Sequence, residues 1–200
     1  MVETVNKTKT QYSVKDLWGT SDSMANDARI LYGRDFRLDV AAMPHNARAQ
    51  RYILPPDYID AFQDVKHHVM RERFRQSELD GKVCVAIDSL NPRIQWENDW
   101  FCNPPFSEEL KKRFIRKAFA MQKLGFGGMM VLPYVPIAGW WADMLDEDVI
   151  IYEPTGRYNY VDTNGIEQRG CAFDSCIVGF PTFKIGPSVR VRYKRFLSSV

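Results

Sequence analysis

The segment Asn103-Pro104-Pro105-Phe106 combines residue types that could bind and activate an amino group. The carboxamide oxygen of Asn103 and the carbonyl of Pro104 can both accept hydrogen bonds from one exocyclic NH2 group, and the ring of Phe106 offers a stacking face for a base. Proline fixes its own φ and restricts the residue before it, so we expect a stiff loop. Taken alone, the motif is equally compatible with a turn that precedes a helix.

Two acids also occur where apolar runs end. Asp39 lies in the alternating segment 36–42, and Asp88 ends the run 82–88. In an open α/β sheet, ligands bind beyond the carboxyl ends of parallel strands, near the point where the strand order reverses. We therefore expect Asp39, Asp88 and Asn103 at one edge of a sheet. The alternative is that the two acids only cap helices.

Strands and helices alternate along most of the chain. Apolar periodicity and end signals predict helices between Asp22 and Gly33, from 57, from 107 and over 140–145. Strands are predicted over 36–42, 82–88, 100–102, 129–133, 149–152, 158–161, 175–180 and 189–193, and those at 82–88 and 100–102 are expected to be buried. This order favours a three-layer α/β sandwich with a mostly parallel sheet and an antiparallel C-terminal edge.

The chain resembles phage-type DNA adenine-N6 methyltransferases, which use S-adenosylmethionine, over roughly residues 16–183. Besides the N-P-P-F motif, Asp16 to Thr20 resembles the family's D-x-W-x-T, Phe36 to Ala42 with Asn46-Ala47 resembles F-x-L-D-V-A-A…N-A, and Asp88 to Leu90 resembles D-x-L. The resemblance implies a class I methyltransferase (Rossmann-like) fold and methyl transfer to adenine N6 in duplex DNA, with GATC as the expected sequence.

The same resemblance implies a role for each matching residue. Asn103, Pro104, Pro105 and Phe106 would hold an adenine that is extruded from the duplex. Asp39 would face the methionine amino group of the cofactor, and Asp88 the amino group of its adenine. The full set of residues expected to contact S-adenosylmethionine is Trp18, Thr20, Asp39, Ala41, Asp88 and Leu90. Methyl transfer needs no metal, so no metal site is expected.

Basic side chains cluster where they could contact phosphate groups. Lys111, Lys112 and Arg113 follow the N-P-P-F motif, and Arg157 begins the loop 157–168 that we expect to read the DNA sequence. Two further clusters lie at 71–75 and 190–195. Each cluster could instead be a solvated face of a helix or strand.

Composition excludes several classes of protein. The 200 residues are 45% hydrophobic with a net charge of only +2, which indicates an ordinary globular domain. Four cysteines make no disulfide framework at this length, and no segment is apolar enough to span a membrane.

We expect a flexible tail over 1–15 and one methyltransferase domain over 16–200 with a helical insertion around 55–82. We expect a cytoplasmic location in a bacterial host, with phage or prophage origin.

Other interpretations stay open at this stage. N-P-P-F-type motifs also occur in enzymes that methylate guanine N2 in RNA, cytosine N4 or protein glutamine, and a relative could bind DNA without turnover. The sequence does not decide between monomer and homodimer. It also does not decide which residues read the DNA, for which the loop 157–168 is the first candidate and the insertion 55–82 the second. Whether methylation serves maintenance, regulation or protection in a restriction–modification pair stays open as well.

Overall fold

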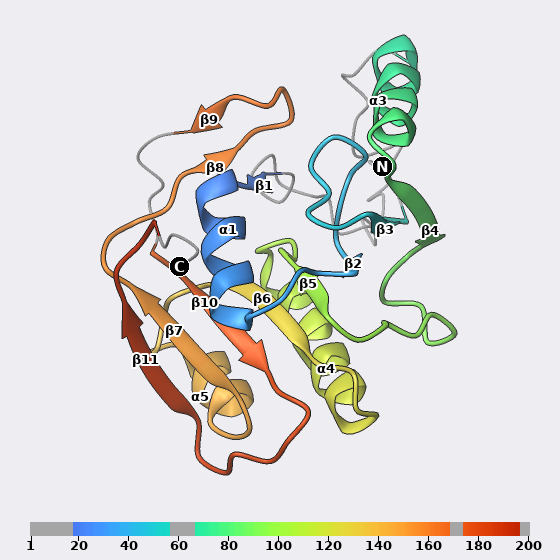
Figure 1. Cartoon of the computed structure of the whole chain (residues 1–200). Helices are drawn as coiled ribbons and strands as arrows, with labels where there is room; N and C mark the ends of the chain where they lie inside the picture. Colours follow the sequence, from blue (N-terminus) through green and yellow to red (C-terminus); the bar gives the residue numbers. More distant parts are fainter. Residues whose placement is uncertain (1–17, 57–66, 169–173, 197–200) are drawn as a thin grey trace, which may run out of the picture.

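Two β-sheets organise the protein in a computed structural model that describes residues 18–56, 67–168 and 174–196 (Figure 1). The larger sheet has the strand order β11-β7-β10-β6-β5-β2-β3-β4, and the smaller one the order β1-β8-β9. The strands are β1 (Gly19–Thr20), β2 (Leu38–Asp39), β3 (Arg51–Leu54), β4 (Val83–Ile87), β5 (Trp100–Cys102), β6 (Gly128–Pro133), β7 (Ile150–Pro154), β8 (Tyr160–Val161), β9 (Glu167–Gln168), β10 (Ser175–Phe180) and β11 (Val189–Tyr193). The helices are α1 (Asp22–Tyr32), α3 (His67–Leu79), α4 (Glu108–Lys123) and α5 (Gly139–Leu145).

The larger sheet confirms the predicted α/β class and its mostly parallel pairing. Strands β4, β3, β2, β5 and β6 pair in parallel, and β11 pairs in parallel with β7. Only β10 runs antiparallel to its neighbours, β6 and β7. The prediction of an antiparallel edge is therefore corrected in one detail, because β10 lies inside the sheet and the edge strand β11 is parallel to β7. Strand order was not visible in the sequence, since pairing depends on which strands meet in space.

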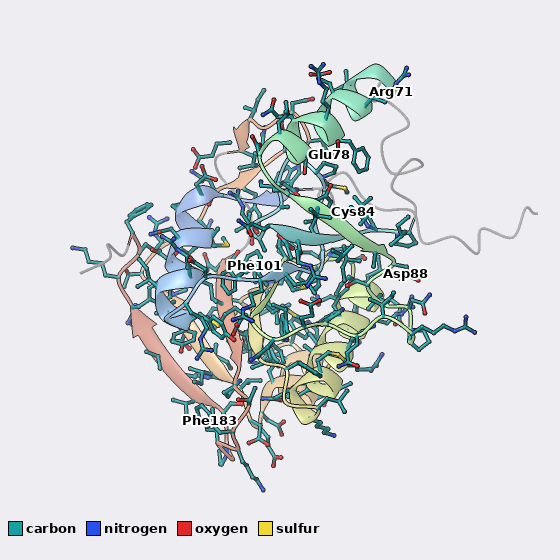
Figure 2. All side chains as sticks on the ribbon, turned by 45° about the vertical axis from the view of Figure 1, so that its right-hand side comes forward. Arg71, Glu78, Cys84, Asp88, Phe101 and Phe183 are labelled. Carbon is teal, nitrogen blue, oxygen red and sulfur yellow. The ribbon has the colours of Figure 1, made fainter. Side chains whose placement is uncertain are left out.

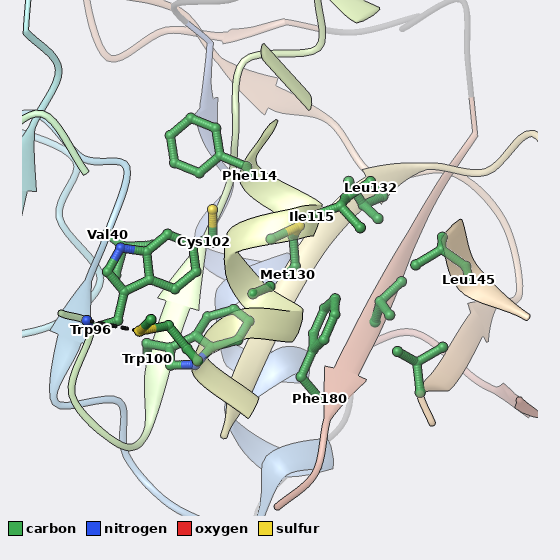
Figure 3. Close-up of a cluster of buried hydrophobic side chains, with 14 of the residues drawn as sticks. Val40, Trp96, Trp100, Cys102, Phe114, Ile115, Met130, Leu132, Leu145 and Phe180 are labelled. Atoms are coloured by element: carbon green, nitrogen blue, oxygen red, sulfur yellow. Dashed lines mark hydrogen bonds between the residues drawn. The ribbon is translucent and has the colours of Figure 1, made fainter. Parts of the chain in front are cut away.

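Helices cover both faces of this sheet, which confirms the three layers. On one face, Met24 and Ala28 of α1 pack with Phe101, Met129 and Ile177. The opposite face carries α4 and α5, whose buried side chains pack with the alternate residues of the same strands (Figure 3). That second cluster includes Ile115, Ala118, Trp141, Leu145, Cys102, Met130, Leu132, Cys176, Val178 and Phe180.

Helix α1 shows why its bounds could be predicted. The side chain of Ser21 accepts a hydrogen bond from the backbone N–H of Met24 at 3.4 Å, which caps the first turn. Gly33 ends the helix with φ 79°, and its N–H donates to the carbonyls of Arg29 and Ile30. Glycine adopts this left-handed conformation without a steric penalty, so the helix ends there.

Strand β4 corrects the prediction that residues 82–88 form a buried strand. It is parallel, but it lies at the edge and pairs only with β3. Val83 and Ile87 are 56% and 59% exposed, while the smaller Cys84 and Ala86 pack toward the protein. An apolar run without alternation is typical of burial on both faces. Here the branched residues lie on the outer face instead.

Of the expected insertion, α3 is described, whereas residues 57–66 and the expected tail over 1–15 lie outside the described residues.

Candidate active site

The strand order of the larger sheet reverses between β2 and β5, because the chain adds β3 and β4 on one side and β5 and β6 on the other. Leu38 lies opposite Trp100, and Asp39 opposite Phe101. The N–H of Val40 donates to the carbonyl of Phe101 at 2.9 Å. The two parallel strands therefore deliver Asp39 and the Asn103 loop to the same edge, as predicted. Figure 2 shows Phe101 within the sheet and Asp88 at the end of β4.

The Asn103 side chain is fixed by a hydrogen bond to a distant segment. Its Nδ2 donates to the backbone carbonyl of Trp18 at 3.0 Å. Trp18 directly precedes β1, which pairs with β8 in the small sheet and aligns Thr20 with Tyr160. The same Asn103 has a buried Oδ1 atom with no hydrogen-bond partner among the described residues. The Trp18 contact thus sets the amide orientation and leaves the oxygen available as an acceptor.

One cavity gathers most of the predicted site residues. It is lined by all six residues expected to contact the cofactor and by Asn103 and Pro105: Trp18, Thr20, Asp39, Ala41, Asp88, Leu90, Asn103 and Pro105. Pro104 is buried beside it. Phe106 is not part of this lining, because its ring packs edge-to-face on Tyr160, with centroids 5.6 Å apart and planes at 89°.

Asp39 is buried and held by the loop that follows β2. Its Oδ1 accepts from the N–H of Ala41 at 3.2 Å, and its Oδ2 from the N–H of Arg48 at 2.9 Å. Burial raises the pKa of Asp39 to about 6, and these two backbone donors oppose that rise. Because the chain turns to make these bonds, β2 is only two residues long, shorter than the predicted strand 36–42.

The loop after β4 presents Asp88, Ser89 and Leu90 to the cavity. Asp88 adopts φ 65°, and its Oδ1 accepts from the N–H of Leu90 at 3.1 Å. Buried Trp96 donates through Nε1 to the carbonyl of Ser89 at 3.2 Å. Lys117 of α4 donates to the carbonyls of Asn91 and Ile94 at 2.8 and 2.6 Å. The loop is therefore held in place by two side chains from outside the cavity.

Polar atoms without partners converge on this cavity. Thr20 Oγ1, Ser89 Oγ, Asn103 Oδ1 and Arg48 Nε are all buried, and none has a hydrogen-bond partner among the described residues. A buried polar group without a partner typically costs about 1–3 kcal/mol. Four such atoms around one cavity indicate a polar ligand that completes their hydrogen bonds. Their donor and acceptor types, together with the acids Asp39 and Asp88, fit a cofactor that carries an amino acid and a nucleoside.

The four predicted DNA contacts do not form one group. Arg113 is exposed and lines the cavity, and Lys112 pairs with Glu108 at 2.6 Å. Arg157 pairs with Asp174 at 2.7 Å on a different segment. Lys111 differs from its predicted surface position, since it is only 6% exposed and its Nζ lies 4.2 Å from the centroid of the Trp140 ring. It lies one helical turn after the N-cap residue Ser107, on the side of α4 that meets Trp140 of α5, which the charge pattern could not reveal.

Two residues at the cavity were missed by the sequence interpretation. Arg48 directly follows the Asn46-Ala47 match, and Ser89 lies inside the D-x-L match. Spacing from a recognised motif was the only available signal for either residue. Arg48 was hidden because arginine is common on surfaces, and serine because it is common in loops.

The two segments expected to read DNA contact each other. Arg73 of α3 donates to the carbonyl of Thr163, in the turn between β8 and β9. Arg71, two residues away, is exposed and lies toward the outer end of α3 in Figure 2. The insertion and the hairpin β8–β9 are thus joined through this contact.

Among the described residues, no helix is long and apolar enough to cross a membrane.

Comparisons with known proteins agree with the resemblance drawn from the motifs. Residues 7–66 match the family model described as DNA N-6-adenine-methyltransferase (Dam). This stretch contains Trp18, Thr20, Asp39 and Ala41, and the match confirms the resemblance and supports a methyltransferase. No curated protein matches the chain.

Six chains of solved structures match this protein. One of them is the "crystal structure of a putative RNA methyltransferase PH1948 from Pyrococcus horikoshii". Its superposition covers 78% of this chain and 79% of that chain, with 13% identity and a TM-score of 0.45.

Proposed function

We propose that the protein is an S-adenosylmethionine-dependent methyltransferase that modifies adenine N6 in duplex DNA. The observation that carries this proposal is the Asn103 amide at the cavity. Its Nδ2 donates to the Trp18 carbonyl, while its Oδ1 is buried and has no partner in the part of the chain that the structure describes. An amide held in this way accepts a hydrogen bond from an amino group and rejects a carbonyl at the same position. Adenine, cytosine and guanine carry such amino groups, so the motif selects for one of them.

The chemistry explains why two acceptors are needed. The lone pair of an exocyclic amino group is delocalised into the ring, which makes the nitrogen a poor nucleophile. Hydrogen bonds from its two protons to Asn103 Oδ1 and the Pro104 carbonyl favour a more tetrahedral nitrogen with a localised lone pair. The stiff Pro-Pro backbone would hold both acceptors in place before the base arrives. The proton that the amine loses becomes acidic as the new bond forms, so the site needs no strong base.

The residues that line the cavity would hold the cofactor next to this base. S-adenosylmethionine supplies an electrophilic sulfonium methyl group when it is bound. Asp39 would accept from an ammonium group, and Asp88 with Leu90 would bind an adenine ring and its amino group. Thr20 and Trp18 would close the end nearest Asp39. The unpartnered Thr20 Oγ1 and Ser89 Oγ atoms support a ligand with many polar groups.

DNA would approach along the edge that carries these loops. Extrusion of a base exposes its face, and Phe106 could compensate for part of the lost stacking. Arg113 at the cavity is our first candidate for a phosphate contact, ahead of Lys112 and Arg157, which pair with Glu108 and Asp174. We retain GATC as the expected sequence, one domain over 16–200, and a phage- or prophage-encoded enzyme of the bacterial cytoplasm as parts of this proposal.

The proposal is tested by methyl transfer from labelled S-adenosylmethionine to duplex DNA, followed by nucleoside analysis. We expect N6-methyladenine from the wild type. Loss of one acceptor that acts in the transition state typically costs 100- to 1000-fold in rate, so Asn103→Ala should reduce turnover by about that factor while cofactor binding persists. Asn26→Ala, in a helix away from the cavity, is the matched control and should keep full activity.

The nucleoside product also decides between alternatives. N4-methylcytosine would redirect the proposal to another base, and label in RNA or protein glutamine would redirect it to another substrate. A wild type that binds the cofactor and DNA without transferring label would identify a non-catalytic relative. Sequencing of methylated sites in host DNA after expression would test GATC directly.

A further inference from the structure

Arg48 lines the cavity and is hydrogen bonded to two acids, to Asp22 through its side chain and to Asp39 through its backbone N–H. Its guanidinium donates to the backbone carbonyl of Thr20 through one terminal nitrogen and to Asp22 through the other. Its backbone N–H binds Asp39 Oδ2 at 2.9 Å. The third guanidinium nitrogen, Nε, is buried with no partner among the described residues, and Arg48 lines the cavity.

The charge pattern around Arg48 suits one end of the proposed cofactor. An α-amino acid carries an ammonium group and a carboxylate on the same carbon, so its binding site needs an anionic and a cationic side chain next to each other. Asp39 supplies the acid. The cationic side chains that line the described part of the cavity are Arg48 and Arg113. Of these two residues, Arg48 is the one whose backbone N–H donates to Asp39. Arg113 comes from α4, with Leu110 and Phe114.

We propose that Arg48 binds the carboxylate of the amino-acid end of S-adenosylmethionine through Nε, with the neighbouring Thr20 Oγ1 as a second donor. This inference rests on the proposed function, because it assigns a contact to the cofactor named there. The Thr20 carbonyl and Asp22 hold the guanidinium plane, so little side-chain freedom is lost when the carboxylate binds. Asp22 is 95% exposed, so solvent weakens its ion pair and leaves the arginine charge available to the ligand.

The test compares the binding of two ligands that differ only in the carboxylate. Dissociation constants for S-adenosylmethionine and for its decarboxylated analogue are measured by calorimetry, without DNA and without turnover. Wild type should bind the analogue about 10- to 100-fold more weakly, as expected for loss of a charge-assisted hydrogen bond. Arg48→Gln should bind S-adenosylmethionine more weakly and lose most of this discrimination. Arg48→Lys, which keeps the charge, should retain part of it.

Arg51→Gln is the matched control, because Arg51 pairs with Glu97 and does not line the cavity. It should discriminate between the two ligands as the wild type does. Equal affinities in the wild type, or full discrimination in Arg48→Gln or Arg48→Lys, would overturn the assignment. Absence of binding of either ligand to folded wild type would instead reject the proposed cofactor. If Arg48→Gln does not fold, the wild-type and Arg48→Lys ratios still decide the question.

Discussion

At the scale of single residues, the site depends on buried polar groups whose orientation is set by the backbone. Asn103 is oriented by the Trp18 carbonyl, and Asp39 by the N–H groups of Ala41 and Arg48. Residue types alone predicted that these side chains would do chemistry. The partners that orient them lie up to 85 positions away in the chain, so no local pattern could identify them.

Asp39 makes cofactor binding dependent on pH. Its pKa is raised to about 6 by burial, and the carboxylate is the form that accepts from an ammonium group. At pH 5, one unit below this pKa, only about a tenth of the Asp39 side chains are ionised, whereas most are ionised at pH 7. The dissociation constant of the cofactor should therefore be roughly tenfold higher at pH 5 than at pH 7. Calorimetric titrations across this range, at constant ionic strength, would check this dependence.

The stability of the free protein provides the control for that experiment. The folded pKa of Asp39 lies above its ordinary value of 3.8, so between about pH 4 and 6 the folded state binds the extra proton. The contribution of this group to stability therefore grows as the pH falls through 6, while cofactor binding weakens. A dissociation constant that stays flat from pH 5 to 7 would contradict the role of Asp39.

Arg113 and Lys111 should behave differently although they are two positions apart. Arg113 is exposed at the cavity, so Arg113→Gln should weaken DNA binding and lower the slope of log affinity against log salt by about 1. Lys111 lies over the Trp140 ring, so Lys111→Gln should lower the unfolding midpoint and leave the salt slope unchanged. DNA binding at several salt concentrations and thermal unfolding separate the two effects. The reverse assignment of effects would refute this division.

At the scale of elements, the sequence predicted most helices and strands because each carries its own local signal. The α1 bounds follow from Ser21 and Gly33, and β10 matches the predicted strand 175–180. The exposure of β4 could not be predicted, because it depends on what lies beside the strand. Strand β1 was missed, since Gly19–Thr20 has no strand pattern and forms only by pairing with β8.

Lys117 illustrates how an element can position a site without touching it. It donates to two carbonyls of the loop that presents Asp88 and Leu90, and it is not among the residues that line the cavity. Lys117→Met should raise the KM for the cofactor about fivefold with little change in kcat. The variant removes two hydrogen bonds from the loop, which destabilises the binding conformation of the loop by roughly 1 kcal/mol.

Arg116→Met changes the neighbouring exposed position of α4 and should leave both constants unchanged. Initial rates at varied cofactor concentration give KM and kcat for each variant. If Lys117→Met lowers kcat and leaves KM unaltered, Lys117 does not act through the cofactor loop.

At the scale of the whole molecule, segments far apart in sequence close around one edge of the sheet. The net charge of +2 gave no indication of a nucleic-acid partner, because it is a sum over all charged residues of the chain. The sum does not distinguish cations at the cavity from cations that pair with acids, such as Lys112 and Arg157. The contact between Arg73 and Thr163 joins the two segments that we expect to read DNA. Charge placement and long-range contacts of this kind arise only on folding.

A buried hydrogen-bond network fastens the C-terminal strand to the first helix. Asp27 of α1 is fully buried and accepts from the Tyr158 hydroxyl and from the N–H of Phe196 at 2.9 Å. The hydroxyls of Tyr158 and Tyr193 are also hydrogen bonded, at 2.8 Å. Burial and the bond to Asp27 raise the pKa of Tyr158, which keeps it a donor.

Tyr158→Phe should therefore destabilise the protein by about 2–3 kcal/mol, because it removes a donor from a buried carboxylate. For a chain of this size, that corresponds to a fall in the unfolding midpoint of roughly 5–10 °C. The control is Tyr152→Phe, since Tyr152 packs against the same cluster and its hydroxyl has no hydrogen bond to the described residues. Equal midpoints for the two variants in thermal unfolding would show that the Asp27 network contributes nothing beyond packing. A selective loss at Tyr158 would show that the hydrogen bonds that join α1, the 158 segment and β11 stabilise the fold.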